Sequence, residues 1–225
     1  MAALLYLFLH PISRLIHLKW GVLQEPHKGA YISTTSFYPA KVLGAAGDGG
    51  AVFTNNSKLA YKVRELANHG RASHYGHSSI GWNSRLDSIQ AAFLNLSLEY
   101  LPQRLASRRS SASFYYKNLS TLNVKQMQPP AQFRENGYCN VCLFDDASVK
   151  KRIESALSKA SIGFGNIYPS TISEQPGASG FLHAHVGGNN AHKLCTSVLN
   201  LPLFAYITEV EMKEAIDILA KNLID

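Results

Sequence analysis

A lysine beside a glycine-rich loop is the feature of this sequence that best suits covalent chemistry. Ser36 and Lys41 lie on either side of Pro39, and the run Gly-Asp-Gly-Gly follows at 47–50. A lysine amine can condense with a carbonyl group, a hydroxyl can donate to a phosphate, and glycines allow close backbone approach. A lone loop lysine is usually a solvated charge, so the flanking residues carry this interpretation. They favour a site in which Lys41 reacts with a phosphorylated aldehyde.

The same loop does not fit the common nucleotide-binding patterns. Residues 44–50 match neither G-x-x-x-x-G-K-[ST] nor G-x-G-x-x-G. Because those patterns set backbone amides around phosphates at fixed spacings, we expect neither a P-loop nor a Rossmann site here.

A C-x-x-C pair with histidines downstream could in principle hold zinc. The candidate ligands are Cys139, Cys142, His183, His185, His192 and Cys195. The cysteine pair lies in a strand-like run, where residues three apart point to opposite faces, and a second C-x-x-C is lacking. We therefore expect free thiols and no metal.

Alternating strands and helices must position these residues. Strands are expected at 30–36, 51–54 and 138–144, and helices at 58–68, 87–101, 103–119, 147–160, 191–198 and 208–223. Ser57 is the expected N-cap of the first helix and Gly70 its stop. Thr208 and Glu211 form a capping box before the last helix. This alternation is typical of α/β units packed on a sheet.

The helix expected at 87–101 carries one apolar stripe at helical spacing. The stripe consists of Ile89, Ala92, Phe93, Leu96 and Tyr100. Because an amphipathic helix buries its apolar face, we expect this stripe to lie in the core.

Composition and charge exclude several classes of protein. The 225 residues are 46% hydrophobic and 16% charged, which is typical of an ordered globular chain. The net charge of +7 is spread along the chain. Its densest basic group, formed by Arg104, Arg108 and Arg109, fits a solvated helix face, and the alternative is a group that attracts the phosphates of a nucleotide substrate. Nothing more specific favours nucleic-acid binding, so none is expected.

The first residues differ in character from the rest. The apolar run at 2–9 is too short to cross a bilayer and lacks the flanks of a signal peptide. A short amphipathic helix on a membrane surface and an irregular or replaced segment are the two interpretations of this region, and we favour the second. The odd number of cysteines, three, favours a reducing compartment. We expect a cytoplasmic protein with no membrane partner.

Two ordered motifs resemble one enzyme family. The first is S-F-Y-P-A-K-V-L-G with the following G-D-G-G, over 36–50, and the second is I-G-W-N-S-R-L-D-S-I-Q-A-A, over 80–92. Both are similar to motifs of the DegT/StrS-type sugar-nucleotide aminotransferases, which are fold-type I enzymes dependent on pyridoxal 5'-phosphate (PLP). The likeness continues at N-H-G (68–70), Y-G-H (75–77), Q-P (175–176) and V-L-N-L-P-L (198–203).

This resemblance implies an α/β fold with a particular division of the chain. Residues 29–125 would be the C-terminal portion of a PLP-dependent aminotransferase large domain, of the aspartate aminotransferase-like type. Residues 126–225 would be a small C-terminal α/β domain, and 1–28 stay unmatched. In the family, an aspartate that pairs with the pyridine nitrogen precedes the lysine, whereas the first aspartate of this chain is Asp48. The resemblance therefore implies an N-terminally truncated member.

The resemblance also implies roles for individual residues. Lys41 would form the Schiff base with PLP and move a proton during catalysis, and Ser36 would donate to the cofactor phosphate. Asn83 would reach the phosphate in a neighbouring subunit, so a homodimer is expected. Arg85 and His77 are the candidate substrate-binding residues. The alternative for Arg85 is a structural salt bridge, and the alternative for His77 is a place in the core or on the rim.

The implied function is a transaminase reaction. An amino group, expected to come from glutamate, would pass to a keto-sugar nucleotide in polysaccharide or glycoside biosynthesis. The nucleotide sugar and the amino-acid donor would be the partners. The alternative is a catalytically inactive truncated remnant, or a regulatory or binding protein of the same family.

Overall fold

The computed structural model of this chain describes residues 31–131 and 135–223, apart from 183 and 185. The expectations for 1–28, and those for His183 and His185, lie outside these residues. Within the described ranges, no helix combines the length and the apolar character needed to cross a bilayer.

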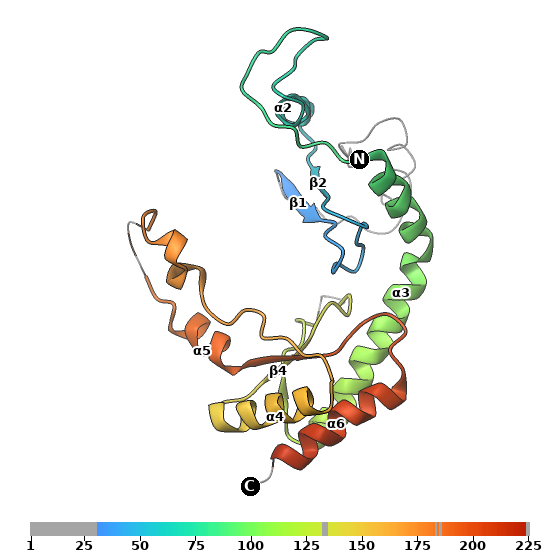
Figure 1. Cartoon of the computed structure of the whole chain (residues 1–225), viewed down its shortest axis with the longest axis vertical. Coiled ribbons are helices and arrows are strands. Elements are labelled where there is room, and N and C mark those ends of the chain that lie inside the picture. Colours follow the sequence, from blue (N-terminus) through green and yellow to red (C-terminus); the bar gives the residue numbers. More distant parts are fainter. Residues whose placement is uncertain (1–30, 132–134, 183, 185, 224–225) are drawn as a thin grey trace. The chain divides into compact units, whose positions relative to one another are not determined.

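Short strands and helices alternate along the described chain (Figure 1). The elements are β1 (Ser33–Ser36), β2 (Gly50–Phe53), α2 (Ser57–Ala67), α3 (Ser88–Thr121), β3 (Lys125–Gln126), β4 (Asn140–Leu143), α4 (Ala147–Lys159), η1 (Ile172–Glu174), η2 (Pro176–Ala178), α5 (Asn189–Ser197), β5 (Val198–Leu201) and α6 (Glu209–Leu223). The expected strands lie close to their predicted positions, while β3 and β5 were not expected. The capping box is confirmed, since Thr208 N–H donates to Glu211 Oε2 and Glu211 N–H to Thr208 Oγ1.

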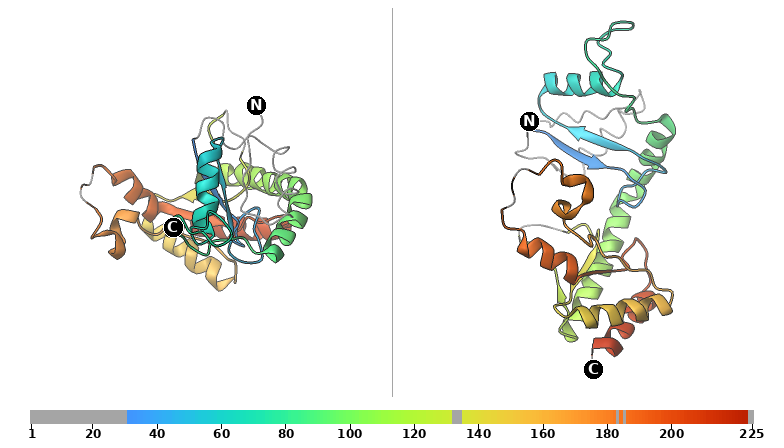
Figure 2. Two further views of the ribbon diagram at one scale, coloured as in Figure 1. Left: turned by 90° about the horizontal axis from the view of Figure 1, so that it is seen from above. Right: turned by 60° about the vertical axis from the view of Figure 1, so that its left-hand side comes forward.

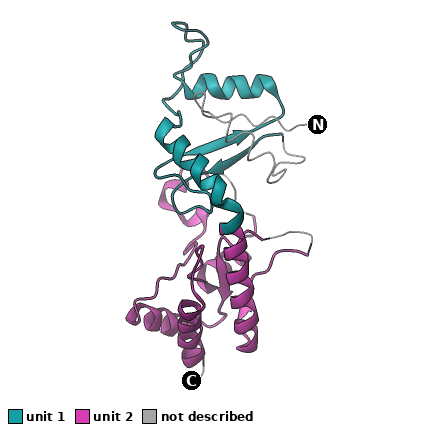
Figure 3. Ribbon diagram, turned by 90° about the vertical axis from the view of Figure 1, so that its right-hand side faces the viewer, with its two compact units in different colours: residues 1–103 teal, residues 104–225 magenta. Residues whose placement is uncertain are grey.

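The chain divides into two compact units between Gln103 and Arg104 (Figure 3). This division falls inside α3, whereas the sequence predicted a boundary at 125/126. Each unit has its own sheet. The assignment of 29–125 and 126–225 to a large and a small domain stays a prediction.

The first unit contains a two-stranded antiparallel sheet of β1 and β2 (Figure 2). Its register pairs Ser33 with Phe53 and Ser36 with Gly50. The end of β1 therefore lies beside the start of β2, and the segment that carries Lys41 is the loop that connects the two strands.

Helix α2 begins one residue differently from the sequence prediction. Asn56, not Ser57, is the N-cap, and its Oδ1 accepts from Lys58 N–H at 3.0 Å and Leu59 N–H at 3.1 Å. Both side chains are good caps, and the amide of Asn56 satisfies two amides at once. Gly70 follows the helix with a φ of 70° and donates its N–H to Glu65 O at 2.9 Å, in keeping with its predicted role as a stop.

The two helices predicted at 87–101 and 103–119 are one continuous helix, α3, with Pro102 inside it. A proline in a helix interior removes one hydrogen bond and costs about 3 kcal/mol. Leu98 and Leu101 before it, and Tyr115 after it, are buried. The prediction of a break was wrong because packing on both sides of Pro102 outweighs this local cost.

The predicted core stripe of α3 is also wrong. Ile89, Phe93, Leu96 and Tyr100 are between 44% and 75% exposed, and Ala92 is exposed as well. The buried residues of this half of the helix are instead Ala91, Leu94, Leu98 and Leu101. Both sets recur at helical spacing, so periodicity alone could not decide which face lies against the unit.

The second unit is built on the antiparallel sheet β3-β4-β5. Strand β4 pairs with β5 so that Cys142 lies opposite Leu199. Helices α4 and α6 pack together, as Figures 1 and 2 show. The core combines fully buried residues from β4, β5, α4, α6 and the end of α3: Tyr115, Leu119, Cys142, Ile153, Leu157, Leu199 and Leu219.

Arg108 does not lie on a solvated helix face as predicted. Its side chain is 7% exposed, and Nη1 donates to Gly137 O at 2.8 Å and Leu203 O at 2.9 Å. Burial lowers the pKa of the Arg108 guanidinium from its ordinary value. The prediction for Arg108 was wrong because its side chain joins α3 to two segments that are distant in sequence, and such contacts leave no local pattern.

Candidate active site

Lys41 lies in a tight turn held by the backbone of Phe37. Phe37 is 1% exposed, its N–H donates to Gly49 O at 2.8 Å, and its carbonyl accepts from Ala45 N–H at 2.7 Å. Lys41 N–H closes the turn by donating to Tyr38 O at 2.9 Å. Phe37 thus joins both ends of the segment, and the half-buried Lys41 lies between them.

The hydroxyl of Ser36 lies at the start of this turn. Its Oγ accepts a hydrogen bond from Tyr38 N–H at 3.1 Å. A hydroxyl that accepts in this way keeps its own hydrogen for donation to another acceptor. Ser36 is exposed, so a phosphate oxygen could accept that hydrogen.

The glycines of the loop are in close contact with their surroundings. A Cβ at position 44 would lie 2.5 Å from the carbonyl oxygen of Pro39. A Cβ at Gly47 would lie 3.0 Å from Gln90 Nε2, and one at Gly49 would lie 2.9 Å from Leu86 Cδ1. The second sequence motif therefore supports the first by packing Leu86 and Gln90 against its glycines.

Asn83 and Arg85 lie in the segment that returns from the loop after α2. Asn83 forms an isolated antiparallel bridge with Asn68, and Arg85 Nη1 donates to Asn68 Oδ1 at 3.0 Å. The same segment caps the end of α2, because Ser84 N–H donates to Ala67 O at 2.9 Å. Two of the predicted site residues are thus anchored through Asn68. The contact predicted between Asn83 and a neighbouring subunit stays a prediction.

A buried carboxylate holds the loop at 70–81 against α2. Glu65 is 6% exposed, and its Oε1 accepts from Lys62 Nζ at 2.7 Å, from Ser78 Oγ at 2.6 Å and from Ser79 Oγ. These hydrogen bonds, that of Lys62 foremost, lower the pKa of Glu65 to about 2. Glu65 was not predicted to have a role, because its partners lie up to 14 residues away in a segment without regular structure.

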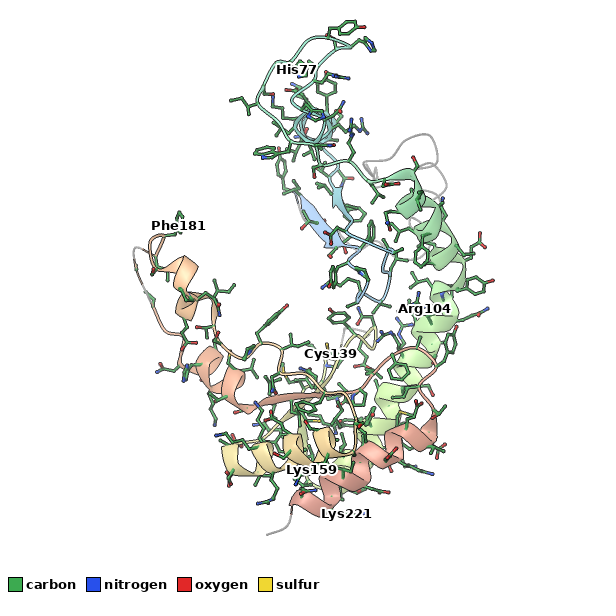
Figure 4. The ribbon with its side chains drawn as sticks, viewed as in Figure 1. His77, Arg104, Cys139, Lys159, Phe181 and Lys221 are labelled. Atoms are coloured by element: carbon green, nitrogen blue, oxygen red, sulfur yellow. The ribbon has the colours of Figure 1, made fainter. Side chains whose placement is uncertain are left out.

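His77 lies on this loop (Figure 4). It is exposed, and its Nδ1 lies 2.9 Å from His69 O. The structure therefore puts Ser36 and Lys41 on one turn, and Asn83, Arg85 and His77 on the segment after α2. Gln90 and Leu86, to which sequence analysis assigned no role, connect the second motif to the glycine loop.

The groups on the turn fit two ends of PLP. The amine of Lys41 can condense with the aldehyde, and the hydroxyl of Ser36 can donate to a phosphate oxygen. The donor set has an amine and a neutral hydrogen-bond donor on one rigid turn, which matches the chemistry of an aldehyde that carries a phosphate.

The residues considered as zinc ligands do not form a group of ligands in the described part of the chain. Cys139, Cys142 and Cys195 form no disulfide, and Cys142 is buried. Among the described residues, no three His, Cys, Asp or Glu side chains are grouped as metal ligands. His192, at the start of α5, lies with its Nδ1 2.7 Å from Glu174 Oε1, and the two side chains link α5 to η1.

Comparisons with known proteins agree with the resemblance found in the sequence. Residues 27–220 match the model of the DegT/DnrJ/EryC1/StrS aminotransferase family. The chain is 32% identical over 186 residues to the UDP-2-acetamido-2-deoxy-3-oxo-D-glucuronate aminotransferase of Pseudomonas aeruginosa, covering 81% of this chain and 49% of that protein.

Solved structures share the fold. A DegT DnrJ EryC1 StrS aminotransferase from Brucella abortus superposes with a TM-score of 0.76 at 30% identity, over 85% of this chain and 50% of that one. DesV from S. venezuelae, solved in complex with a ketimine intermediate, gives 0.78 at 28% identity, over 86% and 52%.

The chain spans about half the length of the relatives it matches. The fold expected from the sequence, a partial aminotransferase fold of the α/β class, is confirmed. This chain belongs to the DegT/DnrJ/EryC1/StrS aminotransferase family.

Proposed function

We propose that this chain provides the reactive lysine of a PLP-dependent sugar aminotransferase, with Lys41 as that lysine. The observation that carries the proposal is the turn itself, in which Phe37 closes both ends around Lys41 and Ser36 keeps a hydroxyl hydrogen to donate. Family membership supports the proposal, and so does the name of the Pseudomonas aeruginosa relative, a sugar-nucleotide aminotransferase.

The residues of the turn have distinct tasks in this proposal. Lys41 Nζ would hold the cofactor by condensing with its aldehyde, with loss of water. Once the amino donor has displaced it, the freed amine would carry a proton between the substrate carbon and the cofactor. Ser36 Oγ donates to the phosphate. Bound PLP would supply an electron sink for the charge that develops at that carbon. The backbone hydrogen bonds of Phe37 and Lys41 hold the main chain at Lys41 close to Ser36, which would lower the entropic cost of bringing the amine and the hydroxyl to one cofactor.

The substrate and assembly follow as further parts of the proposal. The amino group would pass from an amino acid, glutamate in our expectation, to a keto-sugar nucleotide for polysaccharide or glycoside synthesis. Asn83 would contact the phosphate in a second subunit of a homodimer, and Arg85 and His77 would face the substrate. We expect a cytoplasmic, reducing location, in keeping with three cysteines that form no disulfide.

Cofactor trapping tests the proposal on the chain as it exists. Purified protein is incubated with PLP, reduced with borohydride and analysed by peptide mass spectrometry. We expect the pyridoxyl group on Lys41, and its loss in Lys41→Arg, which keeps the charge but cannot condense. Lys58→Arg is the matched control, because Lys58 is an exposed lysine on α2, and it should leave the labelling of Lys41 unchanged.

The opposite result would favour the alternative function. Labelling spread over many lysines, or none, would mean that the motif persists without a working cofactor site. The chain would then be an inactive, regulatory or binding member of the family, and the aminotransferase proposal would be withdrawn for this chain.

A further inference from the structure

Gln90 joins helix α3 to the glycine loop near Lys41. It lies in the first turn of α3, and its Oε1 accepts from Ala46 N–H at 2.9 Å across 44 residues of sequence. Its Nε2 would lie 3.0 Å from a Cβ placed at Gly47. The carboxamide therefore holds the backbone at Ala46 with one end and lies against Gly47 with the other.

The helix start does not require Gln90 for its own cap. Asp87 Oδ1 accepts from Ile89 N–H at 2.8 Å, and Asp87 O accepts from Ala91 N–H at 2.9 Å. A glutamine three residues after an N-cap often reaches back to the cap's own amide. Here the oxygen of Gln90 is directed at Ala46 instead, so the side chain serves the loop.

The residues that Gln90 contacts lie between Ala45 and Gly49, the two residues that form backbone hydrogen bonds with Phe37. Ala45 N–H donates to Phe37 O at 2.7 Å, and Gly49 O accepts from Phe37 N–H at 2.8 Å. Ala46 and Gly47 lie between these anchor points. Because glycines give this loop many alternative backbone conformations, an outside contact is needed to keep both anchors in place at once.

We propose that Gln90 is a positioning residue for Lys41: its carboxamide holds the loop at 46–47, and the loop holds the turn through Phe37. Gln90 itself does not contact the reacting atoms in this proposal. The role toward Lys41 rests on the proposed function, whereas the contact with Ala46 can be tested without it.

Amide hydrogen exchange at Ala46 tests the contact directly. Gln90→Leu keeps the approximate size and removes the acceptor, and we expect exchange at Ala46 to rise roughly 2- to 10-fold, the range of one ordinary hydrogen bond. Gln90→Glu retains an acceptor oxygen and should keep the protection. Gln103→Leu, at an exposed position of the same helix, is the matched control and should change nothing at Ala46.

Pyridoxyl labelling tests the positioning role. The readout is the ratio of label on Lys41 to label on the exposed Lys58, which general unfolding would move towards one by exposing both. We expect Gln90→Leu to lower this ratio several-fold while exchange in α2 stays as in the wild type, and Gln90→Glu to restore it. If Gln90→Leu fails to fold, Gly47→Ala is the second variant. It pushes the carboxamide away without altering Gln90 and should lower the labelling ratio in the same way.

Each contrary result has a definite meaning. Unchanged exchange at Ala46 in Gln90→Leu would overturn the contact. Raised exchange with an unchanged labelling ratio would overturn the positioning role. If the wild-type chain itself shows no preference for Lys41, the proposed function fails together with this role, and exchange at Ala46 still decides whether Gln90 holds the loop.

Discussion

Gly44→Ala is the substitution that most directly tests the geometry of the Lys41 turn. The new Cβ would lie 2.5 Å from Pro39 O, 2.9 Å from Pro39 C and 3.0 Å from Pro39 Cα. All three are backbone atoms, so no side-chain rotation can relieve the contact. The turn would have to widen by at least about 0.5 Å to bring the oxygen to 3.0 Å.

The expected cost follows from this forced shift. Overfilling a well-packed site typically costs about 1–3 kcal/mol, and a backbone obstacle puts Gly44→Ala near the upper end of that range. For a unit of this size, each kcal/mol changes the melting temperature by roughly 4–8 °C. We therefore expect the first unit to melt on the order of 10 °C lower, measured by circular dichroism together with amide exchange in 31–103.

Gly163→Ala is the matched control. No atom lies within 4 Å of a Cβ at Gly163, so this variant should be neutral or stabilised by up to about 1 kcal/mol through its less flexible unfolded state. Pyridoxyl labelling of Lys41 should fall in Gly44→Ala and stay unchanged in Gly163→Ala. If the two variants melt alike and label alike, the close approach of Gly44 to Pro39 is not a feature of the folded protein.

Three further predictions concern other buried groups. Arg108→Met removes two hydrogen bonds made by a charged donor and should lower the free energy of unfolding of the second unit, measured in urea, by about 3–5 kcal/mol. Lys117→Met, at an exposed position, should change that free energy by less than about 0.5 kcal/mol. Equal effects would contradict a structural role for Arg108. The pKa of Glu65 is lowered to about 2 in the folded chain from an ordinary 4.5, so its stabilising effect is complete above about pH 4.5 and is lost as the pH falls towards 2. The difference in unfolding free energy between wild type and Glu65→Gln should therefore shrink from pH 4.5 to pH 2. A difference that does not depend on pH would refute this. Burial raises the pKa of Cys142 to about 12. Iodoacetamide at neutral pH should therefore modify the half-buried Cys195 and should not modify Cys142 until the chain is unfolded. Modification of Cys142 in the folded chain would contradict its burial.

Features set by local chemistry could be predicted from the sequence. The capping box of Thr208 and Glu211 depends on residues three apart, and the stop at Gly70 depends on its own φ. The Lys41 turn is likewise local, since Ser36, Pro39 and the glycines occur within one short segment. These residues act on their immediate neighbours, so their types alone carried the information.

Features that depend on distant contacts could not be predicted. The contact of Gln90 with Ala46 spans 44 residues, and that of Arg108 with Leu203 spans 95. The sequence marked Arg108 only as part of a basic group and Gln90 only as part of a motif, and neither pattern pointed to the distant partner. Helix α3 shows the same limit for packing, because its two apolar faces look alike in sequence and only the folded unit distinguishes Leu94 from Phe93.

The packing of Leu86 and Gln90 against Gly49 and Gly47 has a consequence for how such a sequence can evolve. A larger residue at either glycine is acceptable only if its partner on the second motif becomes smaller or moves. The segments 44–50 and 80–92 must therefore change together. A chimera that takes one segment from a distant relative and keeps the other would combine two segments that did not evolve to pack against each other. Each segment alone would still match the family.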